Sequence, residues 1–116
     1  MIKTEKEVEE FLRQFKPKFN VWGIIFLNRE KNLEALKILG ITPQAREEVI
    51  RKIEADDYIE TIIDNESFGE MWVFGQDYDG TDLYVKISMG KPGNKTICIS
   101  FHVAEHPLVY HYKKEI

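Results

Sequence analysis

Residues that can move protons or hold a phosphate group alternate with apolar residues near the end of the chain. Tyr84 and Lys86 lie in one such stretch, and Ser100 and His102 lie in the next. Successive side chains of a strand point to opposite faces of its sheet, so each pair shares one face. Histidine exchanges protons near neutral pH, lysine stabilises charge on a phosphate, and tyrosine donates a proton or stacks on a base. The four residues therefore suit chemistry at a phosphate, although an ordinary hydrated sheet face would also be polar.

Pairing between the two stretches decides which of these residues meet. One register places Tyr84 opposite His102 and Lys86 opposite Ser100. A slip of two residues places Tyr84 opposite Ser100 and Lys86 opposite Cys98. Both registers gather the four polar residues on one open face. Cys98 shares that face, and we interpret it as structural because nothing near it in the sequence would activate its thiolate.

The two stretches belong to a predicted antiparallel sheet in the second half of the chain. There the spacing of apolar residues changes from a helical period to alternation. Asp79-Gly80 is a strong signal for a two-residue hairpin, which pairs Val73 with Lys86 and Gly75 with Tyr84. The expected strands cover residues 58–64, 70–78, 82–89 and 96–103.

Helices are predicted in the first half of the chain. The first begins with the capping box of Thr4 and Glu7 and is expected to end at Pro17, which lacks a backbone N–H. The last begins at Thr42-Pro43, an N-cap followed by proline at the first helical position.

The segment between these two helices is predicted to hold a strand and a further helix. Residues 20–27 are rich in β-branched and aromatic residues, which favour a buried strand or an extended segment. A helix is expected over residues 29–39, with Gly40 as the residue that ends it. Its inner face is predicted to consist of Leu33, Leu36 and Leu39.

These elements predict one α+β domain over residues 1–116, in which N-terminal helices pack on one face of a C-terminal antiparallel β-sheet. Helices occupy about residues 5–53, the sheet about 58–103, and an irregular tail 104–116. The apolar stripes of the helices and of the strands are expected to meet in one core. From the sheet that core takes Trp72, Phe74, Val85, Ile87, Ile99 and Phe101, and from the helices Phe11, Leu12, Phe15, Val49 and Ile53. The hairpin pairing leaves Met71, Val73 and Gly75 on the open face.

Composition narrows the class of protein. The only cysteine is Cys98, so no disulfide forms within the chain, and a reduced, cytoplasmic setting is expected. No apolar run approaches the roughly 18 residues that a membrane span needs, so no membrane partner is predicted. The net charge of −4 argues against nucleic-acid binding through bulk charge, but not against a local basic patch.

Four short segments resemble the MqsR-type toxins of bacterial toxin–antitoxin systems. They are ADDY at 55–58, MWV at 71–73, LYVKI at 83–87 and ISF at 99–101. The resemblance implies a RelE-like fold and a type II toxin that cuts messenger RNA as a metal-independent endoribonuclease, or mRNA interferase. In that reaction the ribose 2′-hydroxyl attacks the adjacent phosphate, with no cofactor and no metal. The implied partners are the messenger RNA, a cognate antitoxin protein and, as a further candidate, the ribosome.

The resemblance and the polar cluster together suggest site residues. We predict Tyr84, Lys86 and His102 as catalytic, because the family has a functional tyrosine and a functional lysine at the positions of Tyr84 and His102. Ser100 is a further candidate for contact with RNA. The tail interleaves aromatic and basic residues, a pattern that can stack on bases and pair with phosphates, or alternatively can cover a sheet edge. Its predicted RNA-binding residues are His106, Lys113 and Lys114.

Two departures from the family pattern leave a second hypothesis open. Ile59 stands where the family has lysine, and Val73 stands where it has glutamine. If those positions are essential, the chain is a non-catalytic interaction domain that binds a protein through the same open face. A zinc site at His102, Glu105 and His106 is not expected, because that spacing needs a helix and Pro107 follows directly.

Overall fold

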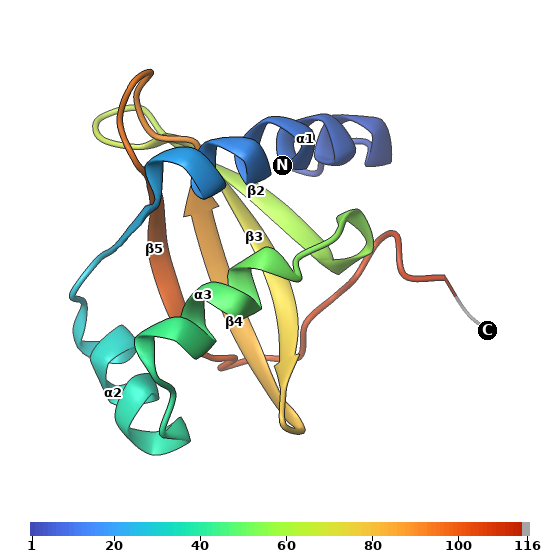
Figure 1. Ribbon diagram of the computed structural model, residues 1–116. Helices are drawn as coiled ribbons and strands as arrows, with labels where there is room; N and C mark the ends of the chain where they lie inside the picture. The colour runs from blue at the N-terminus through green and yellow to red at the C-terminus, as the bar shows by residue number, and fades with distance from the viewer. Residues whose placement is uncertain (115–116) are drawn as a thin grey trace.

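The chain places its helices on one side and at one edge of a twisted five-stranded sheet, as the computed structural model of residues 1–114 shows (Figure 1). The predicted α+β class, with the helices first, is confirmed. The last two residues of the predicted tail, 115 and 116, lie outside the described residues. In chain order the elements are α1 (Glu5–Trp22), β1 (Ile24–Phe26), α2 (Glu30–Leu39), α3 (Pro43–Arg51), the 3-10 turn η1 (Ala55–Asp57), β2 (Tyr58–Asp64), β3 (Gly69–Tyr78), β4 (Thr81–Ser88) and β5 (Thr96–Val103).

Helix α1 begins where the sequence predicts but runs further. Thr4 Oγ1 accepts a hydrogen bond from Glu7 N–H at 3.2 Å, and Glu7 Oε1 accepts one from Thr4 N–H at 3.0 Å, so the capping box forms. The predicted end at Pro17 is wrong, because the helix continues to Trp22. Phe19 lies beyond the proline on the buried stripe and is 2% exposed. Burying its ring is worth about 1.5–3 kcal/mol, which offsets most of the roughly 3 kcal/mol that proline costs inside a helix.

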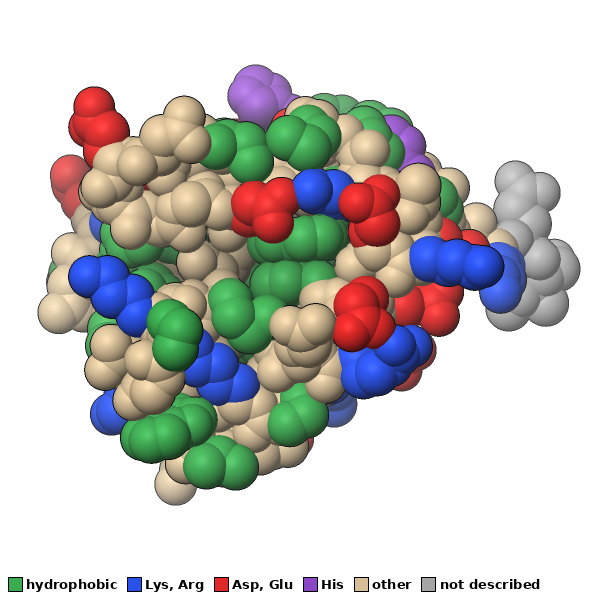
Figure 2. Space-filling model, turned by 90° about the horizontal axis from the view of Figure 1, so that it is seen from above, with side chains coloured by type: hydrophobic (Ala, Val, Ile, Leu, Met, Phe, Trp, Pro, Cys, Tyr) green, Lys and Arg blue, Asp and Glu red, His purple; other side chains and the backbone are tan. Residues whose placement is uncertain are grey.

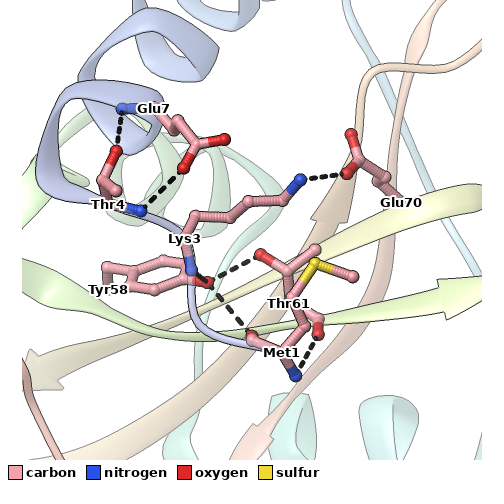
Figure 3. Close-up of polar contacts among 7 residues, drawn as sticks. All are labelled: Met1, Lys3, Thr4, Glu7, Tyr58, Thr61 and Glu70. Carbon is pink, nitrogen blue, oxygen red and sulfur yellow. Dashed lines mark hydrogen bonds and ion pairs between the residues drawn. The ribbon is translucent and has the colours of Figure 1, made fainter.

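The first residues of the chain lie along the outer edge of β2 (Figure 3). The Met1 carbonyl accepts a hydrogen bond from Thr61 N–H at 2.8 Å, and the Met1 amino group donates one to the Thr61 carbonyl at 3.2 Å. The buried Tyr58 hydroxyl accepts from Lys3 N–H at 2.9 Å and lies 2.7 Å from Thr61 Oγ1. Lys3 also forms an ion pair with Glu70 of β3 at 2.5 Å. These contacts fasten the residues before α1 to the sheet.

Helix α2 is turned slightly from the predicted orientation. Leu36 and Leu39 of the predicted inner face are half-buried against the core, but Leu33 is 44% exposed, and the buried residues are Asn32 and Ala35. The reason is that α2 lies against the edge of β5 instead of across the sheet. There the Asn32 side chain substitutes for a neighbouring strand, because Nδ2 donates to the Ile99 carbonyl at 3.0 Å and Oδ1 accepts from Phe101 N–H at 2.9 Å.

The sheet has the order β1-β5-β4-β3-β2. The four strands predicted after residue 57 are antiparallel neighbours, and β1, from the segment expected to be a strand or extended, adds a parallel partner to β5. The predicted hairpin forms and pairs Val73 with Lys86 and Gly75 with Tyr84. Asp79 and Gly80 have φ angles of 52° and 87°, the positive values that a primed hairpin turn requires.

A bulge in β5 interrupts the predicted alternation. The residues after it, from Ser100 on, face as predicted, and those before it do not. Lys86 pairs with Ser100, but Ile87 pairs with Cys98, so Ile99 is the extra residue. Because side chains alternate between the two faces, one extra residue moves every side chain on one side of the bulge to the opposite face. Cys98 therefore faces the core, and its predicted place on the open face is wrong. Between the two registers considered, the structure has the one that pairs Tyr84 with His102.

The core lies between the sheet and α1 and α3. Helix α3 begins at the predicted cap, where Ala45 N–H donates to Thr42 Oγ1 at 3.1 Å. The predicted core residues are all buried, but the bulged Ile99 does not join the central cluster. Within residues 1–114, no helix combines the length and apolar composition needed to cross a bilayer.

The opposite face of the sheet is only partly open, because the tail crosses it. A Cβ atom built on Gly75 would lie 2.3 Å from the Tyr110 hydroxyl and 2.7 Å from Leu108 Cδ1, so only glycine lets the tail pack this closely. Val73, predicted to line the open face, is on that face but fully buried. Further along, Tyr112 stacks on Tyr58 at 6.0 Å between ring centroids. The tail therefore narrows the open face to a groove.

The buried thiol leads to a prediction about alkaline stability. Burial raises the pKa of Cys98 to about 12, whereas a thiol in the unfolded chain ionises near pH 9.0. Because the folded-state pKa is the higher one, this contribution to stability is complete below pH 9 and is lost as the pH rises from 9 toward 12. Urea unfolding should show that the wild type loses about 1.4 kcal/mol more between pH 8 and pH 10 than Cys98→Ala does. Equal losses in the two proteins would contradict the assignment of Cys98 to the core.

Candidate active site

The predicted polar residues form the floor of a groove on the sheet face opposite α1 and α3. Tyr84 and Lys86 of β4 and Ser100 and His102 of β5 all line it, and its volume is about 920 Å³. The ladder holds them in two rows, because Tyr84 pairs with His102 and Lys86 pairs with Ser100. Directly paired residues of an antiparallel ladder have Cβ atoms about 4.5–5.5 Å apart, so each row brings two functional side chains together.

Four parts of the chain form the walls of this groove, one of which is Ile2 near the N-terminus. The start of α2, residues 29–32, forms the side next to β5. On the same face of the sheet, Ile59 and Glu60 of β2 form the opposite wall, toward the other edge. Residues 105–109 of the tail, with His111, close one end. The walls thus come from segments that are far apart in the sequence and that the sheet and the tail bring together.

Tyr84 and His102 form a stacked pair on the floor. Their ring centroids are 5.2 Å apart and their planes differ by 13°. His102 Nδ1 lies 3.0 Å from the Val103 carbonyl, which can only accept, so Nδ1 carries a proton and Nε2 is left for exchange with a ligand. Burial raises the pKa of Tyr84 above its ordinary value, and the Glu60 carboxylate adds to this. The Tyr84 phenol therefore stays protonated and can donate at neutral pH.

Lys86 is a cation that lacks a close acidic partner within residues 1–114. It forms no ion pair with a described carboxylate, and neither does Arg29 on the wall beside it. Burial lowers the pKa of Lys86, and the Arg29 guanidinium lowers it further, whereas Glu60 and Asp64 oppose both effects. The two cations repel each other across a partly dry groove, which is an environment that favours a bound anion.

All three histidines of the chain belong to this groove. His102 is on the floor, and His106 and His111 of the tail are on its rim. In the view from above, histidine side chains lie along one margin of the molecule, while acidic and basic side chains are interspersed elsewhere (Figure 2). The imidazole side chains of the chain are therefore gathered at one site.

The two tail lysines predicted to bind RNA do not join this site. Lys113 forms an ion pair with Asp57 at 2.8 Å, and Asp57 also accepts a hydrogen bond from Gln76 at 2.6 Å. Lys114 lines a separate hollow between α1 and η1. Of the predicted RNA-binding residues, the structure therefore brings only Ser100 and His106 to the groove.

Other residues of the groove were missed by sequence reasoning. Arg29 and Glu60 carry the charges nearest to Lys86, yet they lie on elements whose place beside β4 and β5 no local pattern indicates. A usable signal was the position of Arg29 at the start of a predicted helix, where a cation is unfavourable without an anion nearby. Of the two departures from the toxin pattern, Ile59 lines the groove, while Val73 is fully buried under other residues.

Metal chemistry has no assembled ligand set in the part of the chain that the structure describes. Across residues 1–114 no three His, Cys, Asp or Glu side chains gather in a way that could hold a metal ion. The string His102, Glu105 and His106 leaves β5 and continues without a helix, so it lacks the one-turn spacing of a zinc protease.

The groove can therefore bind an anion and move a proton beside it. Lys86 and Arg29 supply positive charge, His102 supplies an exchangeable nitrogen, and Tyr84 supplies a protonated phenol. The likeness to MqsR-type toxins stays a prediction. No family model, no curated protein and no solved structure matches the chain.

Proposed function

We propose that the protein is a metal-independent RNA endonuclease that acts as the toxin of a toxin–antitoxin pair. The observation that supports this most directly is the Tyr84–His102 stack beside two cations without close acidic partners, Lys86 and Arg29, in one groove. An aromatic stack offers a surface for a base, the cations attract a phosphate, and the imidazole handles the proton. The antitoxin partner rests on the resemblance alone.

The proposed reaction uses the 2′-hydroxyl of the RNA as the nucleophile. His102 Nε2 removes the proton of that hydroxyl, and the oxygen attacks the adjacent phosphorus. The bond from phosphorus to the 5′-oxygen breaks, and the Tyr84 phenol protonates the leaving oxygen. Lys86 and Arg29 stabilise the negative charge that develops on the phosphate. The products are a 2′,3′-cyclic phosphate and a 5′-hydroxyl, so water and a metal ion are not needed in this step.

The net charge of −4 is compatible with this proposal because the attraction is local. Glu30, Glu60 and Glu105 also line the groove, but Glu105 pairs with Lys31 at 2.6 Å, and neither Glu30 nor Glu60 forms an ion pair with Lys86 or Arg29. Opposite charges that neutralise each other on the rim leave Lys86 and Arg29 as the cations nearest the floor. Because a partly buried charge is screened less than one in water, a few cations can hold an RNA backbone there.

A non-catalytic interaction domain is the second candidate. Apolar side chains at one end of the groove favour it, because Ile59, Leu108 and Val109 line the groove together. Such an end suits a side chain of a bound protein segment better than a phosphate. The same groove would then hold an extended peptide, and its cations would meet acidic side chains.

Cleavage of a mixed-sequence RNA in the presence of EDTA tests the proposed function. The full chain should cut the RNA and leave 2′,3′-cyclic phosphate ends, which end-group analysis detects. Strong expression should arrest growth, and co-expression of the adjacent gene should relieve the arrest. Intact RNA together with normal growth would support the interaction domain, while activity that EDTA abolishes would point to a metal at His102 and His106.

A further inference from the structure

We propose that the groove contains a phosphate-binding subsite formed by the start of α2, the Ser100 hydroxyl and the Lys86–Arg29 pair, and that its ligand is the phosphate group of a nucleotide. The subsite uses the groove assigned to RNA cleavage but does not depend on cleavage. It makes a claim about binding that can be measured on small molecules.

The first support is the start of α2. The backbone N–H groups at the first positions of a helix have no partner inside the helix, and the helix dipole makes this end positive. Arg29 is the N-cap residue of α2, and no side chain caps this end. Residues 29–32 line the groove, and the buried Asn32 side chain fixes this end of the helix against β5. An anion in the groove would meet the positive end of a ten-residue helix.

The second and independent support is Ser100. This residue is only 4% exposed and lines the groove. Its hydroxyl makes no hydrogen bond within residues 1–114, whereas the buried Thr96 hydroxyl of the same strand donates to the Gly23 carbonyl at 2.9 Å. Among the described residues the one fully enclosed side-chain polar atom without a partner is Arg46 Nε, so the Ser100 hydroxyl is instead accessible from the groove and available to a ligand. A phosphate oxygen in the groove would accept a hydrogen bond from this hydroxyl.

The third support is the placement of charge. Lys86 pairs directly with Ser100 in the ladder, so its side chain rises from the floor next to the free hydroxyl. Arg29, the N-cap residue of α2, lies on the wall of the groove beside the start of that helix. Neither cation has a carboxylate within ion-pair distance among the described residues. An anion bound between Lys86 and Arg29 would relieve the repulsion between the two cations and accept a charge-assisted hydrogen bond from each.

The neighbouring row of the ladder indicates why the ligand should be a nucleotide. The Tyr84–His102 stack lies two residues along each strand from the Lys86–Ser100 pair, which is about 7 Å at the usual rise of a strand. Stacked rings beside a phosphate site offer a platform for the base that carries the phosphate. Inorganic phosphate should therefore bind weakly, and a nucleoside monophosphate should bind more tightly than a sugar phosphate.

Titration of the full chain with three probes tests the subsite. The probes are inorganic phosphate, ribose 5-phosphate and AMP, followed by calorimetry and by NMR of the backbone amides. Saturable binding should be tightest for AMP, and the amides of residues 30–32 should shift with every probe. Lys86→Met and Arg29→Gln should each weaken AMP binding roughly tenfold, as expected for losing a charge-assisted contact. Lys6→Met, which removes an exposed lysine of α1 on the other side of the sheet, should leave binding unchanged.

Ser100→Ala separates a ligand role from a structural one. It should weaken AMP binding several-fold while leaving the midpoint of urea unfolding unchanged or slightly higher, because the lost hydroxyl has no partner in the protein. Unchanged binding in Ser100→Ala, equal weakening in Lys6→Met, or no saturable binding of any probe would overturn the subsite. Binding of the probes without RNA cleavage would contradict the proposed enzyme and support the subsite. RNA cleavage without binding of the probes would support the enzyme and contradict the subsite.

Discussion

Replacing His102 with alanine is expected to lower the rate of RNA cleavage by about 10²-fold or more. His102 Nδ1 faces the Val103 carbonyl, so its Nε2 is the atom that can exchange a proton with the RNA. Alanine removes that atom, and no other histidine lies on the floor to replace it, since His106 and His111 belong to the tail. The loss should appear mainly in kcat, because Lys86 and Arg29 remain to hold the phosphate.

Tyr84→Phe should have an effect of similar size for a different reason. The substitution keeps the ring, and therefore the stack on His102, but removes the proton donor. Because burial raises the pKa of the Tyr84 phenol, that donor is fully protonated at neutral pH in the wild type. A fall in kcat with an unchanged KM would therefore identify a lost proton transfer instead of a lost binding surface.

Two further variants show whether such losses are specific. Tyr78→Phe makes the same chemical change at the end of β3, outside the groove, and should leave cleavage unchanged. His106→Ala removes an exposed histidine from the rim and should raise KM without a large change in kcat. In urea unfolding, all four variants should have a free energy of unfolding within about 1 kcal/mol of the wild-type value, since none of the four residues is fully buried. Wild-type rates in both His102→Ala and Tyr84→Phe would remove these residues from the mechanism.

The alternation of residues in β4 predicted much of the floor of the groove. Leu83, Val85 and Ile87 had to face a core, so Tyr84 and Lys86 had to face away from it. The hairpin turn then set the register with β3 from two residues alone. Where a strand and its turn are both regular, local sequence is enough to place a side chain.

The bulge shows where local sequence stops being enough. Thr96 to Val103 alternate without a break in the sequence, so nothing in that pattern marks Ile99 as the extra residue. Its position is set by contacts from elsewhere: the Asn32 amide holds the Ile99 carbonyl, and β1 holds the residues before it. Cys98 was therefore assigned to the wrong face while Ser100 and His102, beyond the bulge, were assigned correctly.

The walls of the groove could not be predicted for a similar reason. Arg29 and Glu60 meet Lys86 only because α2 lies at one side of the sheet and β2 at the other. The tail crosses the face because Gly75 leaves room for it. Each of these placements depends on packing between distant segments, and a periodic pattern carries no information about it.

Phe101→Ala should lower the free energy of unfolding by about 3–5 kcal/mol. Phe101 is 1% exposed and belongs to the central core cluster. Its ring meets Phe26 of β1 edge-on, with the centroids 6.2 Å apart and the planes at 88°. It also pairs with Val85 of β4, so the two side chains stand next to each other on the core face of the sheet. Alanine would leave a cavity that the paired strands on either side cannot close.

Leu33→Ala is the matched control for this change. Both variants shorten a large apolar side chain to alanine, but Leu33 of α2 is 44% exposed. Alanine also favours a helix slightly more than leucine does, so the cost should stay within about 1 kcal/mol. Urea unfolding measures both, and a lower midpoint with an unchanged slope identifies a pure loss of stability. A cost for Leu33→Ala as large as that for Phe101→Ala would place Leu33 on the inner face of α2, beside Leu36 and Leu39.

The two changes on β5 can be compared because they are neighbours with opposite roles. Ser100 and Phe101 are both buried, but one faces the groove with a hydroxyl that has no partner and the other fills the core. A domain of this size has a total stability of about 5–15 kcal/mol, so Phe101→Ala would remove a large part of it and Ser100→Ala almost none. If Ser100→Ala were instead the more damaging of the two, the two faces of β5 would have to be exchanged. In that case the groove, with Tyr84, Lys86 and His102, would no longer be a surface at which a ligand could bind.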